Sequence, residues 1–401
     1  MKRSSPPSVA ILSAVRTPIG RYGGTLRSVP ATALGGLAAR AALARGKILP
    51  ADIEEVLFGQ AIQAGAGQNP ARQVLRGAGI PDSVGAATVN MVCGSGMKAI
   101  QLGFTQIVAG EFDRVLVGAM ESMSSSPYLL PASLRWGNPP GPHTLDDAMQ
   151  RDALIDAYAE HEIMGLTGER IAKKFGLTRG EVDAFGLRSH ERAVRATKEG
   201  VFDSELVAVP AEMTPGAGGL AHDEAPRADT TLEKLAKLKP AFAPDGVLTA
   251  GNSSKLSDGA AALVLASRRE VERLGGTPLA WIHSTAESGV HPRDVMESPI
   301  PTVRKHLERT GLSASDFDRV EHNEAYASAS LAVQRTFGFT EEQFNVNGGA
   351  IALGHPIGAS GARIVVSLVQ ELVRSQKRLG LATLCMGGGN GLSVVVERPG
   401  A

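Results

Sequence analysis

Residues 49–57 read Leu-Pro-Ala-Asp-Ile-Glu-Glu-Val-Leu, and residues 312–320 read Leu-Ser-Ala-Ser-Asp-Phe-Asp-Arg-Val. Asp52 aligns with Asp316 and Val56 aligns with Val320 without a gap. Each stretch leads into the same order of predicted elements: a short apolar strand, a glycine-rich turn, an amphipathic helix and a second buried strand. We therefore interpret the chain as two similar α/β halves related by duplication.

The two halves differ after the second buried strand. In the C-terminal half, the predicted strand 381–384 turns through residues 385–391 directly into another strand, 392–396. In the N-terminal half, the strand 114–117 is separated from its counterpart, 260–265, by well over a hundred residues. A structureless loop of that length is uncommon, and we expect an inserted domain instead, with helices at 164–175 and 181–199.

We therefore predict three parts of the chain. Residues 1–122, completed by 251–272, form the N-terminal half; residues 123–250 form the inserted loop domain; and residues 273–401 form the C-terminal half.

Composition excludes several classes of function. Lys+Arg and Asp+Glu number 41 each, and only 4% of residues are aromatic, so neither a nucleic-acid surface nor base stacking is expected. The chain lacks a run of about eighteen apolar residues that would span a membrane. Met1–Pro7 lacks the apolar run of a secretory signal, Pro399–Ala401 is not a peroxisomal signal, and two cysteines form no disulfide framework. We expect a cytoplasmic protein.

Cys93 lies in the segment Asn-Met-Val-Cys-Gly-Ser-Gly (residues 90–96), between a predicted strand and a predicted helix. Unpaired N–H groups at a helix N-terminus stabilise a thiolate. The two glycines let a substrate approach the backbone, and the N–H of Cys93 can point toward a bound carbonyl oxygen. These effects favour a nucleophile; the alternative is a small buried apolar residue.

Three further segments hold candidate functional residues. Cys385 comes directly after a predicted core strand, and the ends of parallel strands are where α/β folds bind ligands. His355 lies among glycines ahead of a helix, which predicts an imidazole that projects from a loop into a cleft. Asn323 and Glu324 follow a short predicted strand at residues 319–320. The alternatives are a structural cysteine, a core or capping histidine and a surface turn.

The sequence motifs of other kinds of site are incomplete in this chain. His161-Glu162 lacks the second histidine of a zincin helix, so we expect no metal site. No glycine run is followed by Lys-Ser or Lys-Thr, as a P-loop requires, and residues 358–361 lack the strand context of a dinucleotide fingerprint. No G-x-S-x-G elbow presents a serine nucleophile.

Taken together, these segments resemble the thiolase family across essentially the whole chain. Both cysteine motifs carry the resemblance, as do residues 14–20 (Ala-Val-Arg-Thr-Pro-Ile-Gly), 65–72 (Gly-Ala-Gly-Gln-Asn-Pro-Ala-Arg) and 249–254 (Thr-Ala-Gly-Asn-Ser-Ser). It implies two α/β halves in α-β-α-β-α layers with an inserted loop domain. It also implies an acyltransferase of fatty acid metabolism, such as β-oxidation. The implied reaction is Claisen condensation of an acyl-CoA with acetyl-CoA, or CoA-dependent cleavage of a 3-ketoacyl-CoA.

The resemblance also implies a role for each candidate. Cys93 would attack the acyl-CoA and hold the acyl group as a thioester, and His355 would take the thiol proton. Cys385 would move the proton at the α-carbon. Asn323 would hold a water beside His355 as a first oxyanion hole, and the N–H groups of Cys93 and Gly387 would form a second. An enolate must form beside an acyl-enzyme, which explains why two thiols are needed.

For substrate handling, the resemblance implies that Ser254 contacts pantetheine, that Arg227 lies near the adenosine phosphates and that Met164 contributes to the binding site. CoA and acyl-CoA are substrates, and no cofactor is bound permanently. The acetoacetyl-CoA-specific subgroup has a His-Met pair where this chain has Ile163-Met164, and Met-Gly where residues 295–299 read Val-Met-Glu-Ser-Pro. Ile163 presents an apolar side chain where the subgroup has histidine, and Val295 is shorter than methionine. Both changes favour longer 3-ketoacyl-CoA substrates.

Three alternatives to this interpretation remain. The first is an acetoacetyl-CoA-specific acetyltransferase. The second is a non-catalytic CoA-binding relative, which would have lost a cysteine or the histidine. The third is a decarboxylating ketosynthase, which replaces the second cysteine with histidine; Cys385 argues against it. The resemblance further implies a homodimer or homotetramer.

Overall fold

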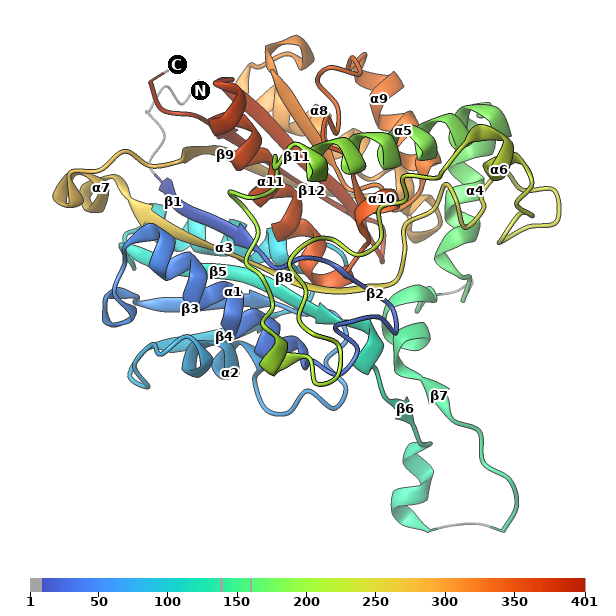
Figure 1. Cartoon of the computed structure of the whole chain (residues 1–401), viewed down its shortest axis with the longest axis horizontal. Coiled ribbons are helices and arrows are strands. Elements are labelled where there is room, and N and C mark those ends of the chain that lie inside the picture. The colour runs from blue at the N-terminus through green and yellow to red at the C-terminus, as the bar shows by residue number, and fades with distance from the viewer. Residues whose placement is uncertain (1–8, 138–139, 159–160, 401) are drawn as a thin grey trace.

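The computed structural model describes residues 9–137, 140–158 and 161–400. The segment Met1–Pro7 and Ala401 lie outside the described residues. A mixed sheet runs through the molecule in the strand order β10-β11-β12-β9-β1-β8-β5-β3-β4 (Figure 1). The two halves meet where β1 (Val9–Arg16) and β9 (Ala280–Gly289) pair antiparallel.

The two halves contribute similar successions of elements, although the second has no named strand equivalent to β4. The first half contains α1 (Ala31–Gly46), η1 (Pro50–Asp52), β3 (Glu55–Gly59), α2 (Pro70–Gly77), β4 (Gly85–Val89), α3 (Ser95–Ala109), β5 (Arg114–Ser122) and β8 (Ser257–Ser267). The second contains α8 (Pro299–Thr310), η7 (Ala314–Asp316), β10 (Arg319–His322), α9 (Ala327–Phe337), α11 (Ser360–Ser375), β11 (Leu379–Met386) and β12 (Asn390–Glu397).

The two stretches that suggested a duplication form equivalent structures. Each is a single 3-10 turn, η1 or η7, that leads into a strand, β3 or β10. β3 pairs parallel with β4 and β5, and β10 pairs parallel with β11. Phe344 forms an isolated parallel bridge to Val320, in the place that β4 takes beside β3. The expected fold of two similar α/β halves is confirmed.

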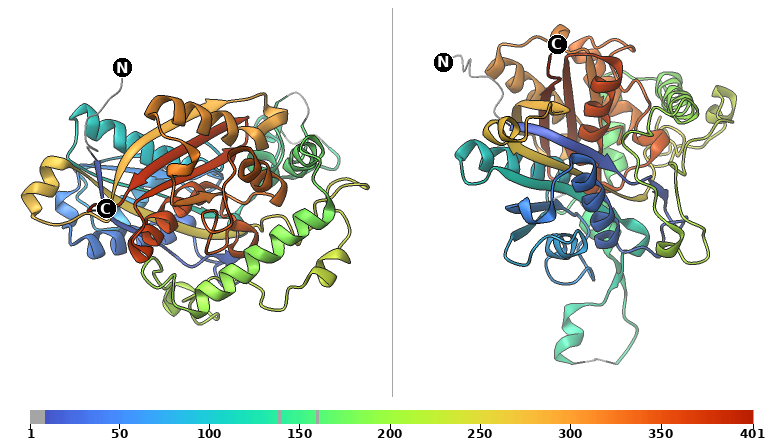
Figure 2. Two further views of the ribbon diagram at one scale, coloured as in Figure 1. Left: turned by 90° about the horizontal axis from the view of Figure 1, so that it is seen from above. Right: turned by 60° about the vertical axis from the view of Figure 1, so that its left-hand side comes forward.

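Helices α3 and α11 form the central layer between the two halves (Figure 2). The core around them joins apolar residues of both helices with residues of strands from both halves. Helices α1 and α2 pack on the opposite face of the first half, and α8 packs on the second. A Cβ atom on Gly96 would lie 2.8 Å from the Cβ atoms of Ala119 and Ala362, so only glycine lets the start of α3 lie this close to α11.

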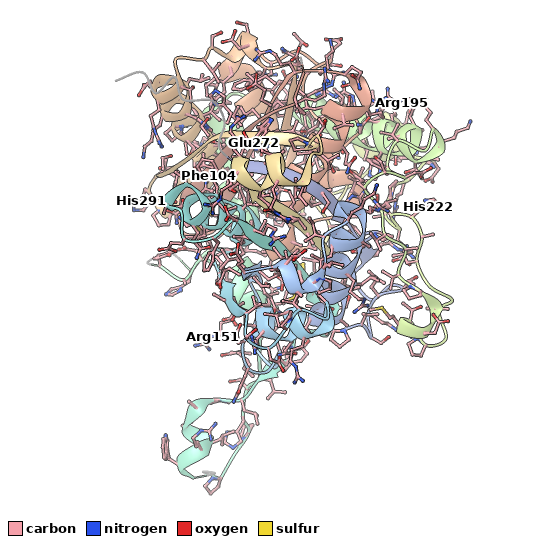
Figure 3. The ribbon with its side chains drawn as sticks, turned by 90° about the vertical axis from the view of Figure 1, so that its left-hand side faces the viewer. Phe104, Arg151, Arg195, His222, Glu272 and His291 are labelled. Carbon is pink, nitrogen blue, oxygen red and sulfur yellow. The ribbon has the colours of Figure 1, made fainter. Side chains whose placement is uncertain are left out.

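The chain between β5 and β8 is helical where the pattern predicts helices. α4 (Met164–Lys174) and α5 (Arg179–Lys198) form there, and the short α6 (Leu232–Ala236) comes after them. Thr178 and Glu181 form a capping box that starts α5. An arm that contains β6 (Tyr128–Leu129) and β7 (Asp146–Asp147) extends away from the body of the molecule, and Arg151 lies where it joins (Figure 3).

Within the described ranges, none of the helices is both long and apolar enough to cross a membrane.

Candidate active site

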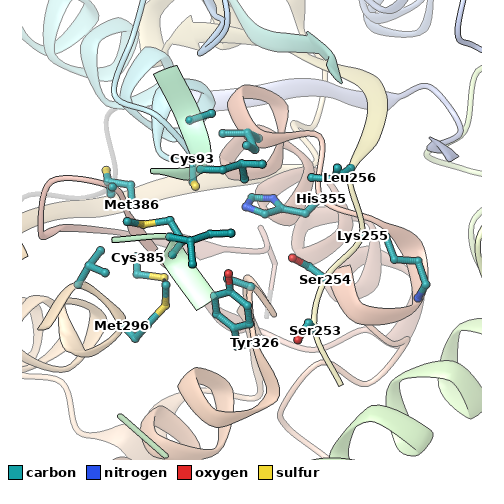
Figure 4. Close-up of a pocket in the computed structure, with 18 of the residues that line it drawn as sticks. Cys93, Ser253, Ser254, Lys255, Leu256, Met296, Tyr326, His355, Cys385 and Met386 are labelled. Carbon is teal, nitrogen blue, oxygen red and sulfur yellow. The ribbon is translucent and has the colours of Figure 1, made fainter. Parts of the chain in front are cut away.

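A pocket of about 350 Å³ collects residues from both halves and from the segment between them (Figure 4). Cys93 comes from the first half, and His355 and Cys385 come from the second; all three line the pocket. Most of the remaining lining is apolar, and includes Met123, Leu154, Met164, Phe242, Val295 and Met296. The three side chains that the sequence singled out for chemistry therefore meet in one place, although they are far apart in the chain.

The backbone before Cys93 makes a sharp turn. Val92 has a φ of 48°, which is a strained conformation for a β-branched residue. Ser95 holds the turn, because its Oγ accepts a hydrogen bond from Met91 N (2.9 Å) and donates one to Val92 O (2.6 Å). The turn places Cys93 between β4 and α3, as predicted, and its side chain faces the pocket.

Burial, together with the neighbouring Cys385, raises the pKa of the Cys93 thiol to about 12. The backbone N–H groups of Gly387 and of Cys93 itself act in the opposite direction, because both donate to the sulfur. These N–H groups therefore favour the thiolate, but desolvation outweighs them in the free enzyme. The two N–H groups proposed for an oxyanion hole do converge at Cys93.

Cys385 lies inside β11, because this strand continues to Met386 and does not end at Leu384 as predicted. Its side chain is buried, and burial raises its pKa to about 12. The sulfur atom of Met296 lies 3.6 Å from that of Cys385. The thiol is thus held by strand and side-chain packing, and is protonated in the free enzyme near neutral pH.

His355 is fixed by hydrogen bonds from both its backbone and its ring. Its backbone N–H donates to Lys255 O at 2.9 Å, and its Nδ1 lies 2.5 Å from Ser360 Oγ. Ser360 donates its own hydroxyl proton to Pro356 O at 3.0 Å, so toward the imidazole it acts as an acceptor. Nδ1 therefore carries the ring proton, and Nε2 keeps a free lone pair.

The imidazole of His355 is neutral in the free enzyme. Burial, together with the charge of Arg363, lowers its pKa to about 3. A neutral imidazole with a free Nε2 lone pair is able to accept a proton from a thiol.

Asn323 is fully buried, and its Nδ2 lies 3.5 Å from His355 Nε2. Its Oδ1 is also buried and has no hydrogen-bond partner among the described residues. A long contact beside an unpaired buried oxygen is an arrangement that an ordered water would complete. The neighbouring Glu324 accepts hydrogen bonds from Ser189 Oγ and Asn345 Nδ2 (2.6 and 2.8 Å), so this segment is not a surface turn.

The predicted substrate-binding residues occupy two cavities. Ser254 and Met164 line the pocket of the two cysteines. Arg227 does not; it lies at an adjoining cavity of about 310 Å³, together with His190 and Lys255. Val295 is fully buried and lines the cysteine pocket, but so does Met296, which occupies the space beside Cys385.

Sequence reasoning missed two residues at the site. Ser360 comes five residues after His355, and the need of a buried imidazole for an Nδ1 partner is the signal that could have found it. Lys255 comes directly after Ser254 and lines both cavities. The signal for Lys255 in the sequence is a lysine that follows a segment of small and polar residues. Among the described residues, no group of three or more His, Cys, Asp or Glu could hold a metal ion.

The sequence matches two family profiles, described as Thiolase, N-terminal domain (residues 9–269) and Thiolase, C-terminal domain (residues 276–398). Acetyl-CoA acetyltransferase of Chromobacterium violaceum is 46% identical over 98% of this chain and 100% of its own length. The corresponding protein of Escherichia coli is 45% identical over 97% of this chain and 98% of its own length.

Solved structures agree with these matches. Acetyl-CoA acetyltransferase of Bacillus anthracis superposes with a TM-score of 0.94 at 41% identity, covering 98% of this chain and 99% of that one. Human mitochondrial 3-ketoacyl-CoA thiolase in complex with CoA gives a TM-score of 0.93 at 38% identity, covering 98% of each chain. These relatives confirm the resemblance that the sequence motifs indicated.

With two thiols and a neutral imidazole in one pocket, and matches to both domains along nearly its whole length, this chain belongs to the thiolase family and is an acyltransferase with thiolase activity.

Proposed function

We propose that the enzyme works by a ping-pong route through an acyl-Cys93 intermediate, with His355 and Cys385 as the proton-transferring groups. The observation that carries this proposal is that all three side chains line one mostly apolar pocket. An acyl group must be stored while the second substrate binds, so the nucleophile and the base that acts on the second substrate need to be separate groups.

In the first half-reaction, His355 Nε2 takes the proton of the Cys93 thiol as the sulfur attacks the thioester carbonyl. The carbonyl oxygen then carries the negative charge, and the N–H groups of Cys93 and Gly387 donate to it. Their direction toward the Cys93 sulfur supports this role. When the tetrahedral intermediate collapses, the CoA sulfur leaves and takes up the proton from His355.

In the second half-reaction, Cys385 moves the proton at the α-carbon of acetyl-CoA, or returns it during cleavage. The enolate oxygen is held by a water bound to Asn323 beside His355. The unpaired Oδ1 of Asn323, close to the imidazole, supports a water at this position. The raised pKa of Cys385 supports its role as a base strong enough for a carbon acid once it is deprotonated.

CoA and acyl-CoA are the proposed ligands, with no permanently bound cofactor. Ser254 would contact the pantetheine arm, Met164 would line the acyl end and Arg227 would lie beside the adenosine phosphates. A solved relative, human mitochondrial 3-ketoacyl-CoA thiolase, binds CoA. We propose that residues 123–250, which carry Met164 and Arg227, are the inserted loop domain that covers the substrate.

Mass spectrometry after mixing with acetyl-CoA tests the intermediate. An acetyl group is expected on the peptide that contains Cys93, and a Cys93→Ser variant should show none and should have no turnover. Acetylation of Cys385 alone in the wild-type enzyme would contradict the assignment.

We also propose that 3-ketoacyl-CoA substrates longer than acetoacetyl-CoA are accepted, as expected of an enzyme in fatty acid β-oxidation. Ile163 at the pocket and the mostly apolar lining support this range. Each buried methylene contributes about 0.8 kcal/mol, so the preference should be graded. Met296 beside Cys385 favours the opposite outcome, a short pocket. Comparing kcat/KM for four-, six- and eight-carbon substrates decides between them, and a hundredfold loss from four to six carbons contradicts broad acceptance.

A homodimer or homotetramer in the cytoplasm is our proposal for the assembly. Two features support it. β4 is the last strand of the sheet, so the backbone of its outer edge is available for pairing. The arm between β6 and β7 exposes large apolar side chains, with Trp136 85% exposed. Light scattering should give a multiple of the 41.7 kDa chain mass, and a stable monomer contradicts the proposal.

A further inference from the structure

Lys255 connects the pocket of the two cysteines with the cavity at Arg227. It lines both. In Figure 4 its side chain leads away from Cys93 and Cys385, on the far side of His355 and Ser254. The ammonium group therefore lies on the side of the second cavity, at a distance from the reacting atoms.

The backbone of Lys255 is firmly held. Its carbonyl oxygen accepts hydrogen bonds from His355 N and from Ser257 Oγ, both at 2.9 Å. Leu256, the next residue, forms a parallel bridge with His355. The Nζ of Lys255 donates to Ile351 O. A side chain on a backbone fixed in this way loses little freedom when it binds a ligand.

His190, on α5, directs a second donor toward Lys255. Its Nδ1 lies 3.1 Å from the backbone N of Arg227, and an amide can only donate, so Nδ1 is the acceptor. Burial lowers the pKa of His190 to about 3, so the ring is neutral and its single proton is on Nε2. That Nε2 lies 3.4 Å from Lys255 Nζ. The N–H of His190 and the ammonium of Lys255 thus face each other as two hydrogen-bond donors.

The charges around this pair leave an excess of positive charge. Arg227 lies close enough to lower the pKa of both His190 and Lys255. Lys234, on α6, lines the same cavity but is already paired with Asp229 at 2.8 Å. Glu324 is the acidic group that raises the pKa of Lys255, and burial outweighs it, so this pKa falls to about 8. Two converging donors beside a guanidinium form a site for an anion.

We propose that Lys255 and the Nε2–H of His190, supported by Arg227, bind a phosphate group of the CoA substrate, and that Lys255 thereby makes the enzyme prefer CoA thioesters to thioesters that lack phosphate. The inference rests on the proposed function, because it takes a CoA thioester as the substrate. The phosphates of CoA lie at the opposite end of the pantetheine arm from the thioester, which fits a cavity that adjoins the cysteine pocket.

Binding of phosphate at this site should depend on pH. An anion favours the charged form of Lys255, so the pKa of the bound complex is higher than that of the free enzyme. Above a pH of about 8 the free lysine loses its proton, and binding must restore it. The affinity for CoA should therefore fall as the pH rises from 7 to 9. The affinity for pantetheine, which carries no phosphate, should not change in this way.

A comparison of two substrates in two variants tests the proposal. Thiolysis of acetoacetyl-CoA and of acetoacetyl-pantetheine is measured for the wild type, for Lys255→Met and for Lys174→Met. Lys255→Met should lower kcat/KM for the CoA thioester by about tenfold or more, the usual cost of a lost hydrogen bond to a charged group. For the pantetheine thioester, the substitution should change kcat/KM by less than about threefold, because most of the effect of Lys255 is on the phosphate. Lys174→Met, the control, should leave kcat/KM nearly unchanged for both substrates, because Lys174 pairs with Glu297 and lines neither cavity.

Equal losses with both substrates would overturn the proposal, because Lys255 would then only support the segment that carries His355. An unchanged CoA activity in Lys255→Met would overturn it as well. Calorimetric binding of CoA and of pantetheine to the same three proteins separates this inference from the proposed reaction. A wild type that binds CoA through Lys255 but turns over neither thioester would contradict the proposed function and uphold the phosphate site.

Discussion

Replacing Ser360 with alanine removes the hydrogen-bond acceptor of His355 Nδ1 and leaves the rest of the pocket in place. Ser360 Oγ lies 2.5 Å from His355 Nδ1, and Ser360 is 1% exposed, so water has little access to replace the lost hydroxyl. In Ser360→Ala the ring proton no longer has a partner at Nδ1. The imidazole can then move that proton to Nε2, where it blocks the lone pair that accepts the Cys93 proton.

The burial of this contact sets the size of the effect. Leaving a buried donor unpaired costs about 1–3 kcal/mol, which corresponds to roughly a fivefold to hundredfold loss in the population of the productive tautomer. Because substrate binding does not require that tautomer, the loss should be in kcat, and KM should remain within about twofold.

Steady-state thiolysis of acetoacetyl-CoA and the rate of Cys93 acylation by acetyl-CoA measure this effect, and both should fall by the same factor. Ser367→Ala is a matched control. Ser367 is a buried serine of the same helix, α11, and its hydroxyl contacts Glu205 at 3.3 Å, not the imidazole. It should retain nearly full activity. A Ser360→Ala enzyme with the wild-type kcat would refute the reasoning about the tautomer.

The second thiol, the protonation of Cys93 and the packing of the core can each be tested in the same way. Cys385→Ser should still acylate Cys93 but lose condensation and cleavage, since only the α-carbon step uses the second thiol; a parallel loss of acylation in a burst assay would assign Cys385 a structural role. Alkylation of Cys93 by iodoacetamide should accelerate up to pH 9 without a plateau, because the raised pKa of about 12 keeps the thiol protonated below that pH; a plateau below pH 8 would contradict the neutral thiol. Gly96→Val should lower the free energy of unfolding by about 1–3 kcal/mol, because the added carbons overlap Ala362 and Ala119. Urea titration measures this, with Gly180→Ala, which adds its Cβ in open space, as the control.

The arrangement of the halves could be predicted because local sequence patterns indicate its helices and strands. Residues 49–57 and 312–320 carry the same alternation of turn and apolar residues, and both become a 3-10 turn that leads into a strand. The amphipathic helix predicted after each stretch forms as α3 in the first half and as α11 in the second. The end of β11 was predicted too early, because a strand can continue into a glycine-rich segment as long as it has a partner, and Met386 pairs with Asn390.

The identities of the reactive residues could likewise be inferred from the sequence, because cysteines and histidines in glycine-rich turns are few and their motifs are specific. Their environment was decided only by the tertiary structure. Whether Cys93 is a thiol or a thiolate depends on how deeply the fold buries it, and desolvation outweighs the helix terminus that the local sequence provides. The tautomer of His355 depends on Ser360, and the positive cavity depends on His190, Arg227 and Lys255. Those three come from separate parts of the chain, and the charges of Arg227 and Lys255 interact only because folding brings them together in a medium that screens them poorly.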